Sequence, residues 1–302
     1  MRERFATGLL FLLAACRHPA GAAARPDASC GAFECAQYDS PIEAFRAAIG
    51  GDVRVVSIGE AHAPKGARAP SSAKRFTETI LSSLAGRASD LVVELMLPPS
   101  GCRAEVALAK KAEEPVTTRH ASADPSEYVA MGEAARKLGV VPDLLRPSCA
   151  DLAAIDASDD PIEASLRTIE RLTREKVVAL LDRNARTPGD AGKIVVTYGG
   201  AIHNDRAPPP ERLAWSFGPA LDQATGGRYV EVDLFVPEFM DGSDVWKSRP
   251  FYAAYDPARL GRKTTMFRLR ERSYVIVFPL VEPAAAEPSP GEPKVGDSGS
   301  PP

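Results

Sequence analysis

Short apolar runs alternate along this chain with longer amphipathic stretches, and the apolar runs predict the strands of a sheet. The first three runs are continuously apolar rather than alternating, which is typical of strands buried on both faces. The predicted strands are Val53–Ile58, Leu91–Leu95, Lys193–Tyr198, Arg228–Val236 and Tyr274–Leu280, with a weaker one at Val140–Leu145 that Pro142 interrupts. The predicted helices are Ile42–Ile49, Ser71–Ala85, Pro125–Leu138, Asp160–Ala185 and Glu211–Ala224.

The order of these elements predicts the fold class. Strands and helices follow one another in turn, which favours an α/β fold with a mostly parallel central sheet and helices on both faces. The last two strands are longer than the others and are candidates for antiparallel edge strands. We expect a single α/β domain over residues 41–281. Residues 282–302 are dominated by Pro, Gly, Ser and Glu, so this tail is expected to be disordered.

The N-terminus has the pattern of an export signal. Residues 1–4 are charged with a positive balance, and residues 5–15 form an uncharged apolar run that is too short to span a bilayer. The Leu-Ala-Ala-Cys sequence ending at Cys16 resembles the lipobox of bacterial lipoproteins, where the cysteine is lipidated. This resemblance implies a signal peptide at 1–15, a lipid anchor on Cys16 and a tether with a small Cys loop at 16–40. An ordinary cleaved signal is the alternative.

The lipobox resemblance also implies a location. A lipid-anchored chain would lie in the cell envelope, and Arg17 after the cysteine favours the outer membrane over retention at the inner one. The membrane is then a partner through the anchor. The net charge is −3 and there is no basic tract, so nucleic-acid binding has no support.

Four further cysteines predict two disulfides, because an even number of cysteines in an exported protein favours pairing. Cys30 and Cys35 are close enough in sequence to close a small loop, which leaves Cys102 and Cys149 as the second pair. Three pairings are possible in principle, and free buried thiols are the alternative.

Histidines and glutamates follow the ends of the predicted strands. Gly59-Glu60-Ala61-His62 follows the first strand, Glu94 lies at the end of the second, and Gly200-Ala201-Ile202-His203 follows the third. Ligands bind at the carboxyl ends of parallel strands, and glycine lets the backbone turn sharply there. Two imidazoles and one or two carboxylates at this edge predict a divalent metal site formed by His62, His203, Glu60 and Glu94. The same residues can also act without metal, with histidine as general base and glutamate holding its tautomer.

Other polar residues are weaker candidates. Asn204 and Asp205 follow His203 and are candidates for binding a ligand or for orienting that imidazole. Asp233 lies on a predicted strand and can reach the same edge. His120 lies in a polar stretch and is interpreted as a loop residue, and Tyr198 is expected in the core. A serine-hydrolase elbow, a phosphate-binding loop and a dinucleotide fingerprint are all absent from the sequence.

The ordered set of two Gly-x-x-His motifs with a glutamate on the intervening strand resembles a known superfamily. That group joins the ChaN haem-binding lipoproteins, the Tiki proteases, the TraB proteins and the erythromycin esterases, and the chain is most like a ChaN-type domain. The resemblance covers about residues 50–205 and implies that Glu60, His62, Glu94 and His203 are the catalytic or metal-binding residues.

Three functions follow from these observations. The first is a metal-dependent hydrolase of ester or peptide bonds, acting on a small-molecule or peptide substrate, with a second glutamate as the base for water. The alternative that the ChaN resemblance implies is a haem- or metal-binding lipoprotein without catalysis, in which a histidine or tyrosine ligates iron. A degenerate scaffold that binds a partner is the third.

Overall fold

The computed structural model describes residues 30–64, 66–102, 125–240 and 244–281. The predicted signal peptide, Cys16, His120 and the predicted C-terminal tail lie outside these residues. Among the described residues, no helix is both long and apolar enough to cross a membrane.

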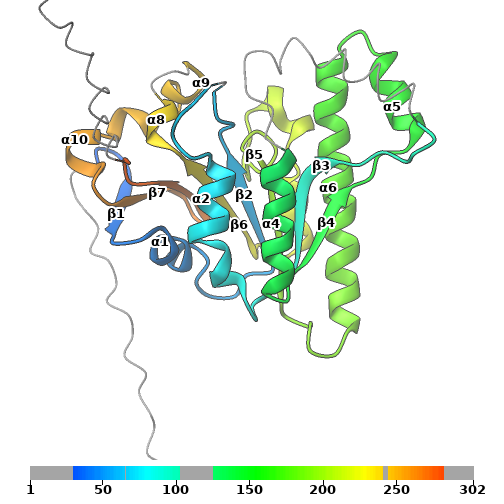
Figure 1. Cartoon of the computed structure of the whole chain (residues 1–302), viewed down its shortest axis with the longest axis horizontal. Coiled ribbons are helices and arrows are strands. Elements are labelled where there is room, and N and C mark those ends of the chain that lie inside the picture. The colour runs from blue at the N-terminus through cyan, green and yellow to red at the C-terminus, as the bar shows by residue number, and fades with distance from the viewer. Residues whose placement is uncertain (1–29, 65, 103–124, 241–243, 282–302) are drawn as a thin grey trace, which may run out of the picture.

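A single eight-stranded sheet forms the centre of the fold (Figure 1). Its strands are β1 (Glu34–Tyr38), β2 (Val55–Glu60), β3 (Ala88–Met96), β4 (Val141–Leu145), β5 (Ile194–Gly200), β6 (Tyr229–Phe235), β7 (Thr264–Arg270) and β8 (Ser273–Val277). Their order across the sheet is β1-β7-β8-β6-β2-β5-β3-β4. The strands from β8 to β4 are parallel, whereas β7 runs antiparallel to both β8 and β1. The predicted α/β fold with a mostly parallel sheet is therefore confirmed.

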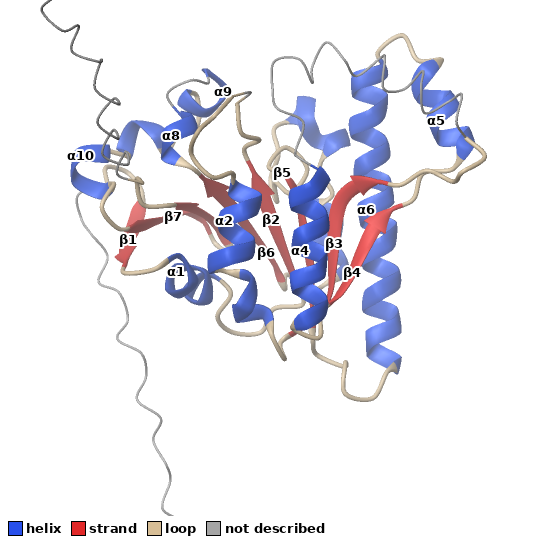
Figure 2. Ribbon diagram, viewed as in Figure 1, coloured by secondary structure: helices blue, strands red, loops and turns tan. Residues whose placement is uncertain are grey.

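Helices cover both faces of the sheet (Figure 2). The α-helices are α1 (Pro41–Ala48), α2 (Ser72–Thr79), α4 (Pro125–Lys137), α5 (Cys149–Asp156), α6 (Pro161–Arg186), α7 (Gly218–Ala224), α8 (Pro237–Met240), α9 (Asp244–Lys247) and α10 (Pro257–Leu260). Short 3₁₀ segments are η1 (Leu81–Leu84), η2 (Pro210–Trp215) and η3 (Tyr252–Ala254). Helices α1, α2 and α4 lie on one face, and α6 and α7 lie on the other.

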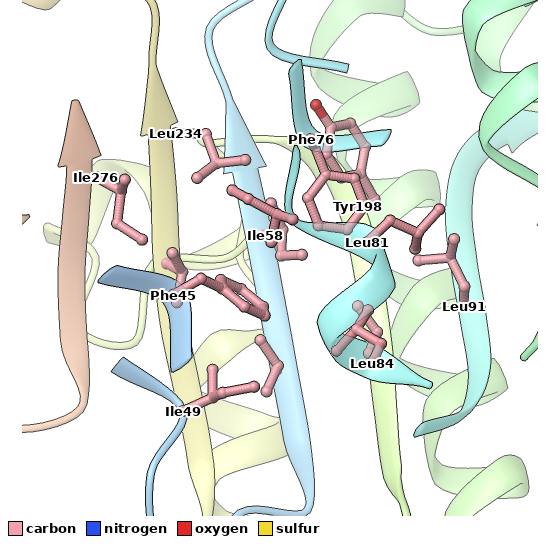
Figure 3. Close-up of a cluster of buried hydrophobic side chains, with 14 of the residues drawn as sticks. Phe45, Ile49, Ile58, Phe76, Leu81, Leu84, Leu91, Tyr198, Leu234 and Ile276 are labelled. Atoms are coloured by element: carbon pink, nitrogen blue, oxygen red, sulfur yellow. The ribbon is translucent and has the colours of Figure 1, made fainter. Parts of the chain in front are cut away.

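Two apolar cores result, because neighbouring residues of a buried strand point to opposite faces. On the first face, Phe45 of α1 and Phe76 of α2 pack over Ile58 and Tyr198 of the sheet (Figure 3). On the second face, a separate cluster contains side chains of β2, β5, α6 and α7. Both sides of the central strands are therefore fully buried, as their continuous apolar pattern predicts.

The structure confirms antiparallel pairing at one edge of the sheet but builds it from other segments than those expected. Strand β6 is parallel to both β2 and β8, so the last two predicted strands do not form that edge. The antiparallel pairs are β1 with β7 and β7 with β8, and the sequence pattern missed β1 and β7. Both mix polar with apolar residues, as strands near an open edge do, and β1 lies inside the segment that was expected to be a tether.

The predicted helix Glu211–Ala224 is also wrong, because it divides into η2 and α7. The break lies at Ser216, whose hydroxyl donates to the carbonyls of His203 and Asp205 at 3.0 and 2.7 Å. Gly218 packs so closely on Asp205 that a side chain there would overlap the Asp205 carbonyl. This region therefore follows the loop after β5 instead of continuing one helix.

Both expected disulfides are present. Cys30, which precedes β1, is joined to Cys35 of β1. Cys102 is joined to Cys149, the first residue of α5. The first bridge is buried beside Phe251 and Phe267, so it belongs to the folded domain and not to a tether.

Candidate functional site

The two glycine-histidine motifs lie side by side at one edge of the sheet. In the parallel pairing of β2 with β5, Gly59 is opposite Gly199 and Glu60 is opposite Gly200. Both strands end at these residues, and each histidine follows in the loop beyond its strand. Glu94 lies near the end of β3, which pairs with the other side of β5. The structure therefore brings together the two histidines and two glutamates that the sequence predicts.

Glu60 is buried, and hydrogen-bond donors occupy both of its carboxylate oxygens. Tyr128 of α4 donates its hydroxyl to Oε1 at 2.6 Å, and Tyr198 of β5 donates its hydroxyl to Oε2 at 2.5 Å. Burial, followed by the negative charge of Glu60, raises the pKa of both tyrosines, so they remain protonated donors. Glu60 is thus arranged to orient another group, which differs from the predicted role as a metal ligand.

The group that Glu60 orients is His62. The His62 Nδ1 atom lies 3.0 Å from Glu60 Oε1, and its side chain is 35% exposed. Burial lowers the pKa of His62, but the hydrogen bond to Glu60 and the charges of Glu60 and Glu94 together raise it above its usual value. Because a carboxylate can only accept, Nδ1 carries the proton, and in the neutral ring Nε2 keeps a free lone pair.

His203 is held in the same tautomer by a different acceptor. Its Nδ1 atom lies 2.7 Å from the backbone carbonyl oxygen of Trp215, which lies just before the break between η2 and α7. The ring is only 2% exposed, and Nε2 lies 3.7 Å from Glu94 Oε1. The other Glu94 oxygen accepts the backbone N–H of Gly200 at 2.8 Å. The Nε2 atom of His203 and an oxygen of Glu94 therefore lie close to each other.

Gly199 and Gly200 make room for this group. A side chain on Gly199 would overlap the Glu94 carboxylate, so glycine is required for Glu94 to lie against β5. A methyl group on Gly200 would lie 3.8 Å from His62 Nε2, 3.9 Å from Glu94 Oε2 and 3.9 Å from His203 Cδ2. All three functional side chains therefore border one small space above Gly200. A separate void of about 10 Å³, room for about one water molecule, borders Glu94 and Gly200 but neither histidine.

The donor chemistry of this group fits a divalent metal ion. Both imidazoles have Nδ1 engaged by an oxygen acceptor, the usual arrangement behind a metal-ligating Nε2. Two ligands of one tetrahedral ion lie about 3.4 Å apart when each bond is about 2.1 Å, close to the 3.7 Å between His203 Nε2 and Glu94 Oε1. As the side chains stand in the described residues, no three of them are close enough to hold an ion. Binding of an ion by all three side chains would therefore require them to rearrange.

Asn204 and Asp205 do not orient His203. The Asn204 amide donates to Asp233 Oδ1 at 2.8 Å, and Asp205 Oδ1 accepts the backbone N–H of Ala207 at 2.9 Å. Sequence reasoning missed Tyr128 and the Trp215 carbonyl. Tyr128 is an ordinary apolar position of α4 by pattern, and a backbone carbonyl leaves no mark in the sequence.

Comparisons with known proteins show no family for this chain. No protein-family model and no curated protein sequence matches it. One solved structure that is similar to it is that of the type III effector HopBA1, with 15% sequence identity and a TM-score of 0.41. The match covers 86% of this chain and 98% of the effector chain.

Proposed function

We propose that this protein is a metal-dependent hydrolase of ester or peptide bonds, with His62, His203 and Glu94 as the metal ligands. The observation that supports the proposal most is the common tautomer of the two histidines. Each Nδ1 is engaged by an oxygen. His203 Nε2 lies 3.7 Å from Glu94 Oε1, and His62 Nε2 borders the space above Gly200 that Glu94 also borders.

A divalent ion held there would activate water near neutral pH and polarise a substrate carbonyl. Other residues of the chain would position the metal ligands. Glu60, held by two tyrosines, fixes the tautomer of His62 and increases its basicity. The Trp215 carbonyl does the same for His203, and the N–H of Gly200 keeps Glu94 facing His203.

The proposed role of Glu60 is therefore positioning. Its carboxylate is buried and both oxygens are engaged, so it is poorly placed to take a proton from water. Glu94 is the more accessible carboxylate, with 16% of its side chain exposed. We assign the third ligand to Glu94 because its Oε1 atom faces His203 Nε2.

The lipid anchor on Cys16 stays part of the proposal. It would hold the domain in the cell envelope and restrict its substrates to small molecules or peptides found there. Residues 17–29, between Cys16 and the described part of the chain, would separate the domain from the membrane surface.

Hydrolysis by purified protein tests the proposal. Parent protein loaded with Zn²⁺ should cleave a p-nitrophenyl ester or a fluorogenic peptide, and chelation should abolish the reaction. His62→Ala and His203→Ala should each lose activity, and the double variant should be hardly worse, because ligands of one ion act as a unit. His120→Ala is the control and should match the parent.

Two results would contradict the proposal. One is activity that survives in His62→Ala, and the other is activity that is unaffected by chelation. A Soret band in the purified protein, with no turnover, would support the haem-binding alternative instead.

A further inference from the structure

A second polar cavity lies beside the candidate site and has no role in the proposed chemistry. Its volume is about 370 Å³, within the roughly 300–1,000 Å³ range of small-molecule sites. Residues of β6 and β8, Phe251 and the loop that follows His203 form its walls. Its charged lining consists of three carboxylates and three arginines: Asp205, Glu231, Asp233, Arg212, Arg249 and Arg270.

Two of the carboxylates are deeply buried on one face of β6. Glu231 is 4% exposed and Asp233 is 5% exposed. The backbone N–H of Arg206 donates to Glu231 Oε2 at 2.9 Å, and Asn204 donates to Asp233 Oδ1 at 2.8 Å. Within the described part of the chain, no lysine or arginine lies within 4.0 Å of either carboxylate. Burial and the charge of Asp233 raise the pKa of Glu231 to about 8. A cation placed between them would relieve that cost.

Two of the three arginines that line the cavity are available to a negatively charged ligand. Among the described residues, Arg212 and Arg249 have no carboxylate within ion-pair distance. Arg249 lies over the ring of Trp246, with its guanidinium carbon 5.5 Å from the ring centre, which fixes its position. Arg270 donates to the carbonyl of Ala207 at 3.2 Å and lies 4.0 Å from Asp205. Burial raises the pKa of the Asp233 carboxyl, and longer-range attraction to Arg249 and Arg212 lowers it in part, but neither arginine lies within ion-pair distance of it. Both guanidinium groups can therefore still take a direct partner.

The rest of the lining is apolar. Phe33, Phe251 and Leu269 contribute to the wall, and Phe251 is held rigidly between Phe235 and Phe267, with ring centres 4.9 and 5.7 Å away. A ligand for this cavity therefore needs an apolar body as well as charged ends. Rigid aromatic walls with a few convergent charged groups are typical of small-molecule sites.

We propose that this cavity binds a small zwitterion, with an amine beside Glu231 and Asp233, a carboxylate at Arg212 and Arg249, and an apolar body against Phe251 and Leu269. Short peptides and their relatives have this chemistry. The inference goes beyond the proposed hydrolase and does not require a metal ion. Asp233 and Asn204 connect the cavity to the loop of His203, but the charged groups that would recognise the zwitterion are separate from the metal ligands.

Calorimetric titration with three related dipeptides tests the proposal on the unaltered protein. The probe is L-leucyl-L-phenylalanine, and the controls are its N-acetyl form, which lacks the amine, and its C-terminal amide, which lacks the carboxylate. We expect the free dipeptide to bind and each blocked form to bind about ten- to hundredfold more weakly, as the loss of a charged hydrogen bond implies. Equal affinity for all three, or no binding at millimolar concentration, would overturn the proposal.

Two variants locate the binding. Glu231→Gln should weaken binding of the free dipeptide but not of the N-acetyl form, and Arg249→Met should weaken the free dipeptide but not the amide. The titrations use metal-free protein, so a failed hydrolase assay and a failed zwitterion site give different results. Parent-like binding by both cavity variants would place the ligand elsewhere. If Glu231→Gln does not fold, the titrations of Arg249→Met and of the parent with the three dipeptides still test the proposal.

Discussion

Adjacent glycines at the end of β5 give a matched pair of perturbations of the candidate site. Gly199 and Gly200 are neighbours in one buried strand, and neither has a positive φ, so alanine fits the backbone at both. Through its effect on the unfolded chain alone, alanine at either position contributes about 0.4–1 kcal/mol of stability. The two variants differ only in what the new methyl group meets.

At Gly199 the methyl group would overlap the Glu94 carboxylate and lie 2.7 Å from Glu94 Cβ. Overpacking of this kind costs about 1–3 kcal/mol. Because the unfolded-state gain is common to both variants, Gly199→Ala should be less stable than Gly200→Ala by about 1–3 kcal/mol. Urea unfolding of the two purified variants measures this difference directly.

At Gly200 the methyl group meets nothing closer than 3.8 Å, so Gly200→Ala should be as stable as the parent or slightly more so. It would nevertheless occupy the space that His62, His203 and Glu94 border. We expect both variants to bind Zn²⁺ about tenfold or more weakly, Gly199→Ala because Glu94 moves and Gly200→Ala because the space is filled.

Gly101→Ala is the control for this pair, since a methyl group there meets no atom within 4 Å and φ is not positive. It should gain the same stability and keep the parent affinity for Zn²⁺. Parent-like affinity in Gly200→Ala would show that the ion is not bound in the space above that residue. Equal stability of the Gly199 and Gly200 variants would show that Glu94 does not pack on β5.

Three other predictions concern the hydrogen bonds of Glu60, the titration of Glu231 and the lipid anchor on Cys16. Tyr198→Phe removes the hydrogen-bond donor to Glu60 Oε2. It should lower the free energy of unfolding in urea by about 1–3 kcal/mol and weaken Zn²⁺ binding about 10–100-fold. An unchanged affinity for Zn²⁺ would refute the positioning role of Glu60. Glu231 has a pKa of about 8 in the fold against an ordinary 4.5, so its contribution to stability is complete below pH 4.5 and is lost as the pH rises to 8. Glu231→Gln should therefore lose less stability than the parent between pH 5 and pH 8, by an amount on the order of several kcal/mol, and parallel curves would contradict the raised pKa. Cys16→Ser should abolish labelling by radioactive palmitate, and equal labelling would exclude the lipid anchor.

The parts of the fold that could be predicted are those fixed by local pattern. The continuous apolar runs predicted the central strands because burial on both faces favours apolar residues at successive positions. The glycine-histidine spacing predicted which side chains lie together, because parallel strands with matched register end at the same edge, as the pairing of Gly59 with Gly199 shows.

The parts that could not be predicted depend on contacts between distant segments. Strands β1 and β7 carry mixed polar and apolar residues, and their pairing joins the two ends of the described chain. The hydrogen bond from Tyr128 to Glu60 joins residues 68 positions apart, and only the folded sheet places them together. The break before α7 depends on Ser216 bonding to the loop after β5, which the helical pattern of that segment conceals.

Metal stoichiometry tests the central claim most directly. Protein stripped with chelator, loaded with Zn²⁺ and desalted should retain one ion per chain by elemental analysis. His62→Ala and His203→Ala should retain none, whereas His120→Ala should match the parent. Parent protein that retains no ion, or His62→Ala protein that retains as much as the parent, would contradict the account.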